Sequence, residues 1–166
     1  MIDDIDRKIL KILQNNARTS NADIARTVGM APSAILERIR KLERKNVILG
    51  YEARINPKAL GLGLTAFTFV RTEEGVGSTA SGQMLGDIPE VQEVHHTAGQ
   101  DCYLVKVRVE DAEALGRLLK RFGRIPEVRD TRTTIVLTTV KETACLSIDP
   151  ESPQENKTSQ ENAQYG

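Results

Sequence analysis

The 166-residue sequence predicts an α+β fold, in which an N-terminal helical domain precedes a C-terminal domain of alternating strands and helices. Two observations support this prediction. Up to about position 45, apolar residues recur every three or four positions, as on the buried face of a helix. From Val47 they alternate with polar residues, as in strands that have one buried face. The turn-rich segment "NPKALGLG" at residues 56–63 predicts the boundary between the two domains.

Three helices are expected in the first 50 residues, joined by short turns. Asp3 or Asp4 is placed to cap the first helix, and Ser20 begins the second, which stops at Gly29. Pro32 takes the favoured first position of a third helix that runs to about residue 45. Two short helices separated by a tight, glycine-containing turn form a helix-turn-helix pattern. The buried faces of the first two helices are expected to hold Ile5, Ile9, Ile12, Leu13, Ile24, Ala25 and Val28.

The second half is expected to follow the order β-α-β-β-α-β, which is the ferredoxin-like unit. Strands are predicted at 64–72, 91–98, 102–109 and 128–140, and helices at 78–88 and 112–123. Alternation also predicts a strand at 47–55, ahead of the hinge. Residues 149–166 contain four acids, one lysine and almost nothing apolar, so we expect a disordered acidic tail that cannot offset its ordering entropy.

Composition excludes several classes of protein. Lys and Arg equal Asp and Glu at 23 each, so the chain is not a wholesale basic protein of the histone kind. No apolar run is long enough to cross a membrane, and the N-terminus lacks the pattern of a signal peptide. Cys102 and Cys145 lie far apart with no CxxC pattern, so neither a disulfide framework nor a zinc site is expected. We expect a cytoplasmic protein with no metal, no cofactor and no membrane partner.

The third helix carries the strongest functional signal. Residues 1–50 hold ten Lys and Arg against six Asp and Glu, which favours contact of this end with a polyanion. At about 100° per residue, the helix divides into one apolar face and one face with five basic residues against a single acid. In a helix-turn-helix this helix enters the DNA major groove. We expect Ser33, Ala34 and Glu37 to lie near base edges, and Arg38, Arg40, Lys41 and Arg44 near phosphates.

The N-terminal half is similar to that of the Lrp/AsnC (leucine-responsive, or feast/famine) transcriptional regulators. The similarity lies in "IDDIDRKILKILQNNARTSNADIARTVGMAPSAILERIRKLERKNVILGYEARINPKALG", residues 2–61. Near the other end, "EVRDTRTTIVLTTVKE" at 127–142 resembles the last strand of the family's effector domain. One departure is Ala31, because the family often has a capping Ser before the Pro.

The resemblance implies a winged helix-turn-helix that binds double-stranded DNA, a hinge strand, and a ferredoxin-like domain that dimerises through its sheet. In the family such dimers commonly assemble into tetramers, octamers or hexadecamers, of which we expect a tetramer or octamer here, and an amino acid or related metabolite binds between subunits. We therefore expect a helix-turn-helix DNA-binding domain at 1–50 and a hinge strand and linker at 51–63. An effector-binding and oligomerisation domain follows at 64–148, and the acidic tail at 149–166.

The turn before the third strand of the second domain departs from the family pattern. Relatives commonly carry G-x-x-D-Y, whose Asp suits a ligand's ammonium group, whereas "GQDCY" puts Cys102 in that position. An uncharged thiol cannot replace a carboxylate. Asp101 can substitute only if the turn is rearranged, which Gly99 permits, and the alternative is a turn that only joins two strands. We expect the effector near Gly99, Asp101, Cys102, Tyr103, Thr131 and Thr133.

Two other functions fit the sequence less well. For an enzyme, His95 and His96 are adjacent on a predicted strand and point to opposite faces, and no Gly-rich phosphate loop, H-E-x-x-H or G-x-S-x-G occurs. A metabolite sensor or assembly protein without DNA binding would not need the intact basic helix-turn-helix. We expect a non-enzymatic, sequence-specific DNA-binding transcriptional regulator that senses an amino acid or related metabolite, and that works as a homodimer or larger assembly.

Overall fold

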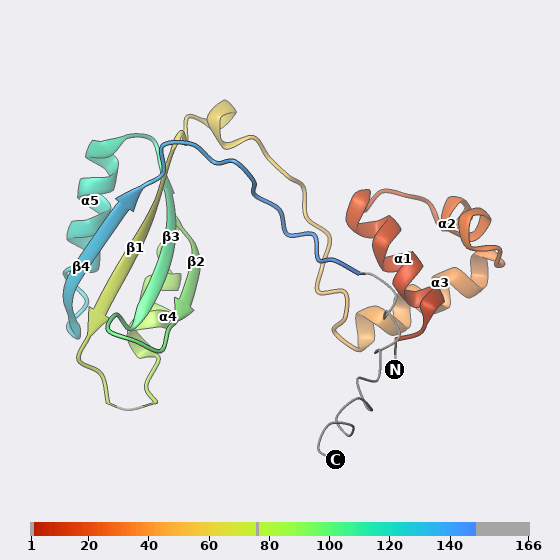
Figure 1. Ribbon diagram of the computed structural model, residues 1–166, viewed down its shortest axis with the longest axis horizontal. Coiled ribbons are helices and arrows are strands. Elements are labelled where there is room, and N and C mark those ends of the chain that lie inside the picture. Colours follow the sequence, from red (N-terminus) through yellow and green to blue (C-terminus); the bar gives the residue numbers. More distant parts are fainter. Residues whose placement is uncertain (1, 76, 149–166) are drawn as a thin grey trace, which may run out of the picture. The chain divides into compact units, whose positions relative to one another are not determined.

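The structure, a computed structural model, describes residues 2–75 and 77–148 and consists of two compact units (Figure 1). Of the described residues, the helical unit contains 2–53 and 143–148. The sheet unit contains Arg54–Glu142. The tail at 149–166, expected to be disordered, lies outside the described residues.

The helical unit contains three helices: α1 (Asp4–Asn15), α2 (Asn21–Val28) and α3 (Pro32–Arg44). Local signals explain their ends. The Asp3 carboxylate accepts a hydrogen bond from the Asp6 backbone at 2.8 Å, Ser20 caps α2, and Gly29 ends it in the left-handed region. As expected, Ala31 gives α3 no side-chain cap. These three predicted helices are therefore confirmed.

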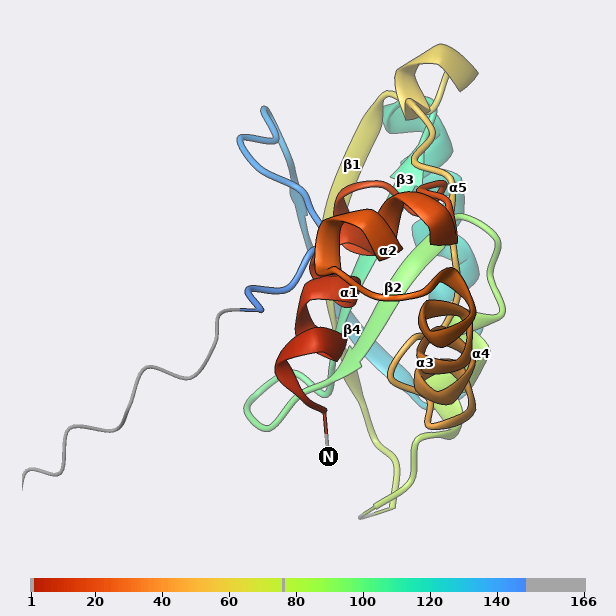
Figure 2. The same ribbon diagram turned by 90° about the vertical axis from the view of Figure 1, so that its right-hand side faces the viewer.

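The three helices of this unit are drawn as ribbons in Figure 2. Their buried apolar side chains form a common core. Ile9 of α1, Ile24 of α2 and Ile35 of α3 are fully buried there. Each isoleucine buried in this way contributes about 1.5–3 kcal/mol relative to an exposed one. Their packing fixes which face of α3 remains in water.

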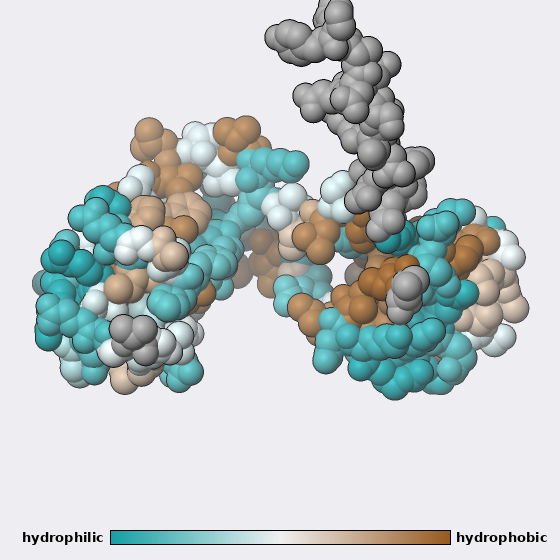
Figure 3. All heavy atoms as spheres, turned by 60° about the horizontal axis from the view of Figure 1, so that its bottom comes forward, coloured by the Kyte–Doolittle hydropathy of each residue, from teal (hydrophilic) through white to brown (hydrophobic). Residues whose placement is uncertain are grey.

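The strand predicted at 47–55 is not formed in the described chain, and no strand provides the wing that the resemblance implies. The chain there is irregular, and Leu49 and Ile55 are 89% and 67% exposed. A strand needs a neighbour for its backbone hydrogen bonds, and no described segment pairs with this one. The alternation of apolar and polar residues predicted the strand, but such a pattern does not show which segment would pair with it. Hydrophobic side chains accordingly reach the surface of both units (Figure 3).

The sheet unit confirms the predicted order β-α-β-β-α-β. A short 3-10 helix, η1 (Pro57–Leu60), precedes the elements β1 (Leu64–Thr72), α4 (Ala80–Gly86), β2 (Val91–His96), β3 (Tyr103–Val109), α5 (Ala112–Phe122) and β4 (Val128–Ile135). The strands are antiparallel, in the spatial order β2-β3-β1-β4. β4 ends at Ile135, before the predicted position 140: Ile135 pairs with Ala66 of β1, and the Val136 N–H then donates to the Thr65 carbonyl at 2.9 Å beyond the end of the strand.

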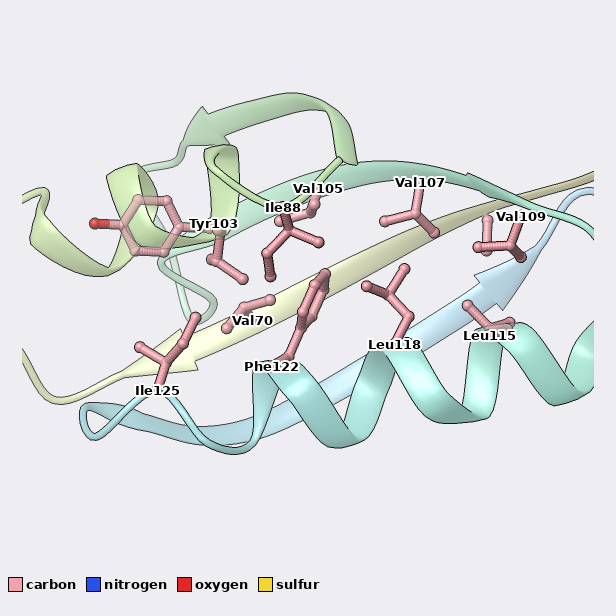
Figure 4. Close-up of a cluster of buried hydrophobic side chains, with 12 residues drawn as sticks. Val70, Ile88, Tyr103, Val105, Val107, Val109, Leu115, Leu118, Phe122 and Ile125 are labelled. Atoms are coloured by element: carbon pink, nitrogen blue, oxygen red, sulfur yellow. The ribbon is translucent and has the colours of Figure 1, made fainter. Parts of the chain in front are cut away.

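The core of this unit lies between one face of the sheet and the helices α4 and α5. Figure 4 shows Leu115, Leu118 and Phe122 of α5 pointing toward the valines of β3. β3 alternates strictly between buried and half-buried residues, so its odd-numbered side chains face the helices. The opposite face of the sheet is not covered by any helix of this unit.

Charged residues on this uncovered face bind Glu142, the last residue of the sheet unit. Lys106 of β3 forms an ion pair with Glu93 at 2.9 Å and a second ion pair with Glu142. Arg108 lies 3.2 Å from Glu142, and Arg54 donates a hydrogen bond to the Glu142 carbonyl at 3.0 Å. The last residues of the sheet unit are therefore held by charge rather than by strand pairing.

Residues 143–148 group with the helical unit. The Gln14 side chain of α1 holds this segment. Its amide donates to the Leu146 carbonyl at 3.1 Å and accepts from the Leu146 backbone N–H at 2.7 Å. Such a two-bond contact between residues far apart in sequence leaves no local pattern to detect.

The ion pairs of Glu142 make the stability of the sheet unit sensitive to acid. Hydrogen bonding to Lys106 lowers the pKa of both Glu93 and Glu142 below the ordinary glutamate value of 4.5. A lowered folded-state pKa adds stability above the unfolded-state value, which is lost as the pH falls through the folded-state value. We expect urea midpoints to fall below about pH 4.5 more steeply for the natural protein than for Glu142→Gln. Glu110→Gln, an exposed control, should keep the natural pH profile, and equal profiles for all three proteins would contradict this account.

Candidate nucleic-acid interface and effector turn

The turn between α2 and α3 leaves the start of α3 open to solvent. Gly29 adopts φ +74°, and the backbone N–H groups of Gly29 and Met30 both donate to the Ala25 carbonyl, at 2.9 and 3.0 Å. A shallow hollow of about 450 Å³ lies beside this turn, lined by Ala22, Ala25, Arg26, Gly29, Met30, Ala31 and Pro32. A glycine is needed at position 29 because the left-handed conformation strains other residues.

The two faces of α3 differ as the sequence predicted. Ile35, Ile39 and Leu42 are buried in the helical unit. The opposite face presents to solvent the exposed residues Ser33, Glu37, Arg40, Lys41 and Arg44, with Ala34 half-buried beside them. The structure thus brings six of the seven expected DNA-contacting residues onto one accessible face.

Electrostatically, this face is only partly neutralised. Arg40 lies 3.4 Å from Glu37, one turn away on the same helix. Within residues 2–75 and 77–148, no ion pair forms to Lys41 or Arg44. Both groups can therefore meet phosphates without breaking an ion pair to any other described residue.

Arg38, the seventh residue, has a different environment. Its Nη1 lies 2.7 Å from Asp3 Oδ2 and 2.7 Å from Asp6 Oδ1, both at the start of α1. The Arg38 side chain is 28% exposed, against 55% for Arg40. Sequence reasoning missed this contact because the acids lie more than 30 positions away and only the fold brings them together.

The β2–β3 turn contains the expected effector residues Gly99–Tyr103. Gly99 has φ +156°, and the Asp101 carboxylate accepts a hydrogen bond from Arg132 of β4 at 2.7 Å. The Cys102 sulfur lies 3.5 Å from both the backbone nitrogen and the carbonyl oxygen of Thr72. Asp101 and Cys102 therefore have different partners, and only Asp101 offers a carboxylate at this turn.

Tyr103 is the buried end of this turn. Its hydroxyl donates to Glu74 Oε1 at 3.2 Å, and the same oxygen accepts from the Ser81 backbone at the start of α4, also at 3.2 Å. Burial raises the pKa of Glu74, but hydrogen bonds from Ser81 and Tyr103 outweigh that effect and hold the value below its usual range. A charged Glu74 thus links the turn to α4.

Strand register separates Thr131 and Thr133 from Asp101. Val70 of β1 pairs with both Tyr103 and Thr131, so Thr131 shares the helix-covered side of the sheet with Tyr103. Thr133 lies on the same side, with its hydroxyl 3.0 Å from that of Thr68. Arg132, between them, points to the uncovered face and carries its pair with Asp101 there. The six expected residues therefore occupy both sides of the sheet.

A helix-turn-helix with an exposed basic face, joined to an antiparallel α/β unit, defines a transcriptional regulator with separate DNA-binding and ligand-binding parts. The comparisons with known proteins assign its family. The model of the AsnC-type helix-turn-helix domain matches residues 2–43, and that of the Lrp/AsnC ligand binding domain matches residues 65–146. The chain belongs to the Lrp/AsnC family.

Similar proteins come from archaea and bacteria. The HTH-type transcriptional regulator FL11 of Pyrococcus horikoshii is 42% identical over 147 residues, which cover 89% of this chain and 97% of FL11. The leucine-responsive regulatory protein of Escherichia coli K12 is 38% identical over 150 residues, 89% of this chain and 92% of that protein. The similarity extends over nearly the whole length of both relatives.

Solved structures agree with the fold. An AsnC family transcriptional regulator from Agrobacterium tumefaciens superposes with a TM-score of 0.82 at 30% identity, covering 88% of this chain and 97% of that one. A feast or famine regulatory protein from M. tuberculosis, complexed with L-methionine, has a TM-score of 0.82 at 36% identity, covering 88% and 99%. That relative therefore binds an amino acid.

Among the residues that the structure describes, no group of three or more His, Cys, Asp or Glu side chains is arranged to hold a metal ion. None of the described helices has the length and apolar character needed to cross a bilayer.

Gly82 of α4 is expected to be essential for the position of Tyr103. A Cβ atom at residue 82 would lie 2.5 Å from Tyr103 Cε1, whereas at Gly116 in α5 a Cβ would meet nothing within 4 Å. We expect Gly82→Ala to lower the unfolding free energy by about 1–3 kcal/mol in urea titrations, as overpacking does. The matched Gly116→Ala should raise it by about 0.5–1 kcal/mol, because alanine favours a helix. A Gly82→Ala protein as stable as the natural one would show that the ring is free to move.

Proposed function

We propose that α3 reads double-stranded DNA from the major groove. Ser33, Ala34 and Glu37 lie in its first turns and meet base edges, while Arg40, Lys41 and Arg44 meet the flanking phosphates. The observation that carries this proposal is the exposed basic face of α3, with Lys41 and Arg44 unpaired in the described chain. The small side chains at 33 and 34 allow the backbone to approach the bases closely.

A homodimer is the proposed DNA-binding form, with tetramers or octamers built from it. One short helix reads few base pairs, and a two-fold dimer doubles the contact. The uncovered face of the sheet, where Phe67, Phe69 and Leu104 are half-buried, supports pairing of two sheet units. We place the protein in the cytoplasm, with the DNA of the cell, and assign it no enzymatic activity.

The sheet unit is the proposed sensor for an amino acid or related metabolite. The supporting observation is the Asp101–Arg132 pair, which carries a carboxylate and a guanidinium on one side of the turn. An α-amino acid presents the complementary ammonium and carboxylate, so both of its charges find partners. Asp101 thus supplies the carboxylate for the ligand's ammonium group, which Cys102 cannot supply. The L-methionine complex of the M. tuberculosis relative supports this class of ligand. Thr131 and Thr133 face the other side and shape the sheet beneath the pair.

Salt dependence of DNA binding tests the role of α3. Each phosphate contact releases counterions and contributes about 0.9 to the slope of log K against log salt concentration. We expect Lys41→Ala to reduce the slope by about 0.9 for each α3 bound, measured by fluorescence anisotropy on duplex DNA. Lys120→Ala, an exposed control on α5, should leave the slope unchanged. Equal slopes for the natural protein and Lys41→Ala would remove α3 from the interface.

Calorimetry tests the sensor. We expect methionine or a similar amino acid to bind the natural protein, and Asp101→Ala to cost about 1.5–3 kcal/mol of binding free energy through loss of a charged hydrogen bond. Arg132→Ala should weaken binding similarly, whereas Glu110→Ala, at an exposed position directly after β3, should not. Binding that survives Asp101→Ala would show that no carboxylate of this turn holds the ligand.

A further inference from the structure

The start of α1 and the middle of α3 are joined by three charged side chains. Arg38 Nη1 contacts one oxygen of Asp3 and one oxygen of Asp6, each at 2.7 Å. The Asp6 side chain is only 6% exposed. We call Asp3, Asp6 and Arg38 the anchor cluster.

Within the anchor cluster the four carboxylate oxygens are divided between two tasks. Asp3 Oδ1 accepts from the Asp6 backbone at 2.8 Å, and Asp6 Oδ2 accepts from the Asp3 backbone at 3.3 Å, which completes a capping box. The other oxygen of each carboxylate contacts Arg38. The residues that begin α1 are therefore the same residues that hold α3.

The charge of the anchor cluster argues against a phosphate contact. One guanidinium against two carboxylates leaves a net charge of −1, so the cluster repels a phosphate rather than attracting it. Withdrawing Arg38 toward DNA would leave the buried Asp6 without its charged partner, which is strongly unfavourable. Arg40, Lys41 and Arg44, in contrast, lie in solvent.

The position of Arg38 on α3 explains what the contact does. α3 begins at Pro32 with no side-chain cap, so no cap hydrogen bond fixes its first turn. The proposed base-reading residues Ser33, Ala34 and Glu37 lie within the five residues before Arg38. We infer that Arg38 is a positioning residue that fixes the orientation of α3 against α1, and so sets the DNA sequence preference without touching DNA. This inference rests on the proposed reading of DNA by α3.

Variants of Asp6 and Arg38 distinguish a positioning role of Arg38 from a phosphate contact. The two roles predict opposite changes in DNA affinity when the Asp6 carboxylate is removed. Asp6→Asn removes one negative charge near the DNA surface, so it would tighten binding if Arg38 were thereby freed to meet a phosphate. For a positioning role, Asp6→Asn loosens α3 and weakens operator binding. The probes are an operator duplex selected in vitro and a scrambled duplex of equal length, with affinities measured over a range of salt concentrations.

We expect both Asp6→Asn and Arg38→Gln to lower the ratio of operator to scrambled affinity by roughly 5- to 150-fold, as loss of one base contact does. Their salt slopes should stay at the natural value, and the double variant should lose no more than the worse single variant. Arg38→Lys, which retains the charge, should recover part of the ratio. Lys41→Ala should instead lower both affinities and the slope, and leave the ratio nearly unchanged.

The inference is overturned if Arg38→Gln lowers the salt slope by about 0.9 for each α3 bound, as Lys41→Ala does, or if Asp6→Asn tightens binding. An unchanged ratio in Arg38→Gln overturns it as well. If no variant, Lys41→Ala included, alters DNA binding, the proposed reading by α3 fails instead. Should Asp6→Asn unfold, Asp3→Asn gives the same test at an exposed position, because Asn also caps helices well.

Discussion

The helical unit depends on the orientation of a single amphipathic helix. α3 must bury Ile35, Ile39 and Leu42 against α1 and α2 while its basic face stays in water. Apolar packing fixes which face is buried, since burial is favourable but has little directional preference. The charged contact at Arg38 adds direction, because a guanidinium and two carboxylates meet in only a few geometries. The stability and the orientation of α3 thus come from different interactions.

The sheet unit also has one buried and one open face, because helices cover only one side of its sheet. α4 and α5 take the apolar side chains of β3, and the other face keeps Lys106, Arg108 and Arg132 with their acidic partners. The β2–β3 turn is fixed on both sides: Tyr103 binds Glu74 and α4 on the covered side, and Asp101 binds Arg132 on the open side. A ligand that displaces Asp101 from Arg132 would therefore alter one side of this turn, while the bond between Tyr103 and Glu74 still joins the other side to the core.

Local signals made much of the fold predictable. Helix caps and stops at Asp3, Ser20 and Gly29, and the alternation of β1 and β3, depend on near neighbours in the chain. The prediction of a strand at 47–55 was wrong. Strand pairing depends on a distant segment of the chain, which the alternation of apolar and polar residues does not reveal.

The same distinction holds at the candidate sites. The exposed face of α3 follows from helical geometry, so its residues could be chosen from the sequence. Arg38 also falls at the edge of that face, but its acidic partners are set by the packing of α1 on α3. Likewise the separation of Asp101 from Thr131 depends on the register of β1 with β4. Sequence patterns indicate the face of an element on which a side chain lies. Which residue it contacts is known only from the fold.

Arginine footprinting tests the central claim, that α3 meets DNA with its outer cations while Arg38 holds the helix from within. The full-length protein would be treated with phenylglyoxal, free and bound to duplex DNA, and the modified arginines identified by mass spectrometry. The account predicts that Arg40 and Arg44 react in the free protein and are protected by DNA, while Arg38 reacts slowly in both states. Rapid reaction of Arg38 that DNA suppresses, with Arg40 and Arg44 unprotected, would contradict it.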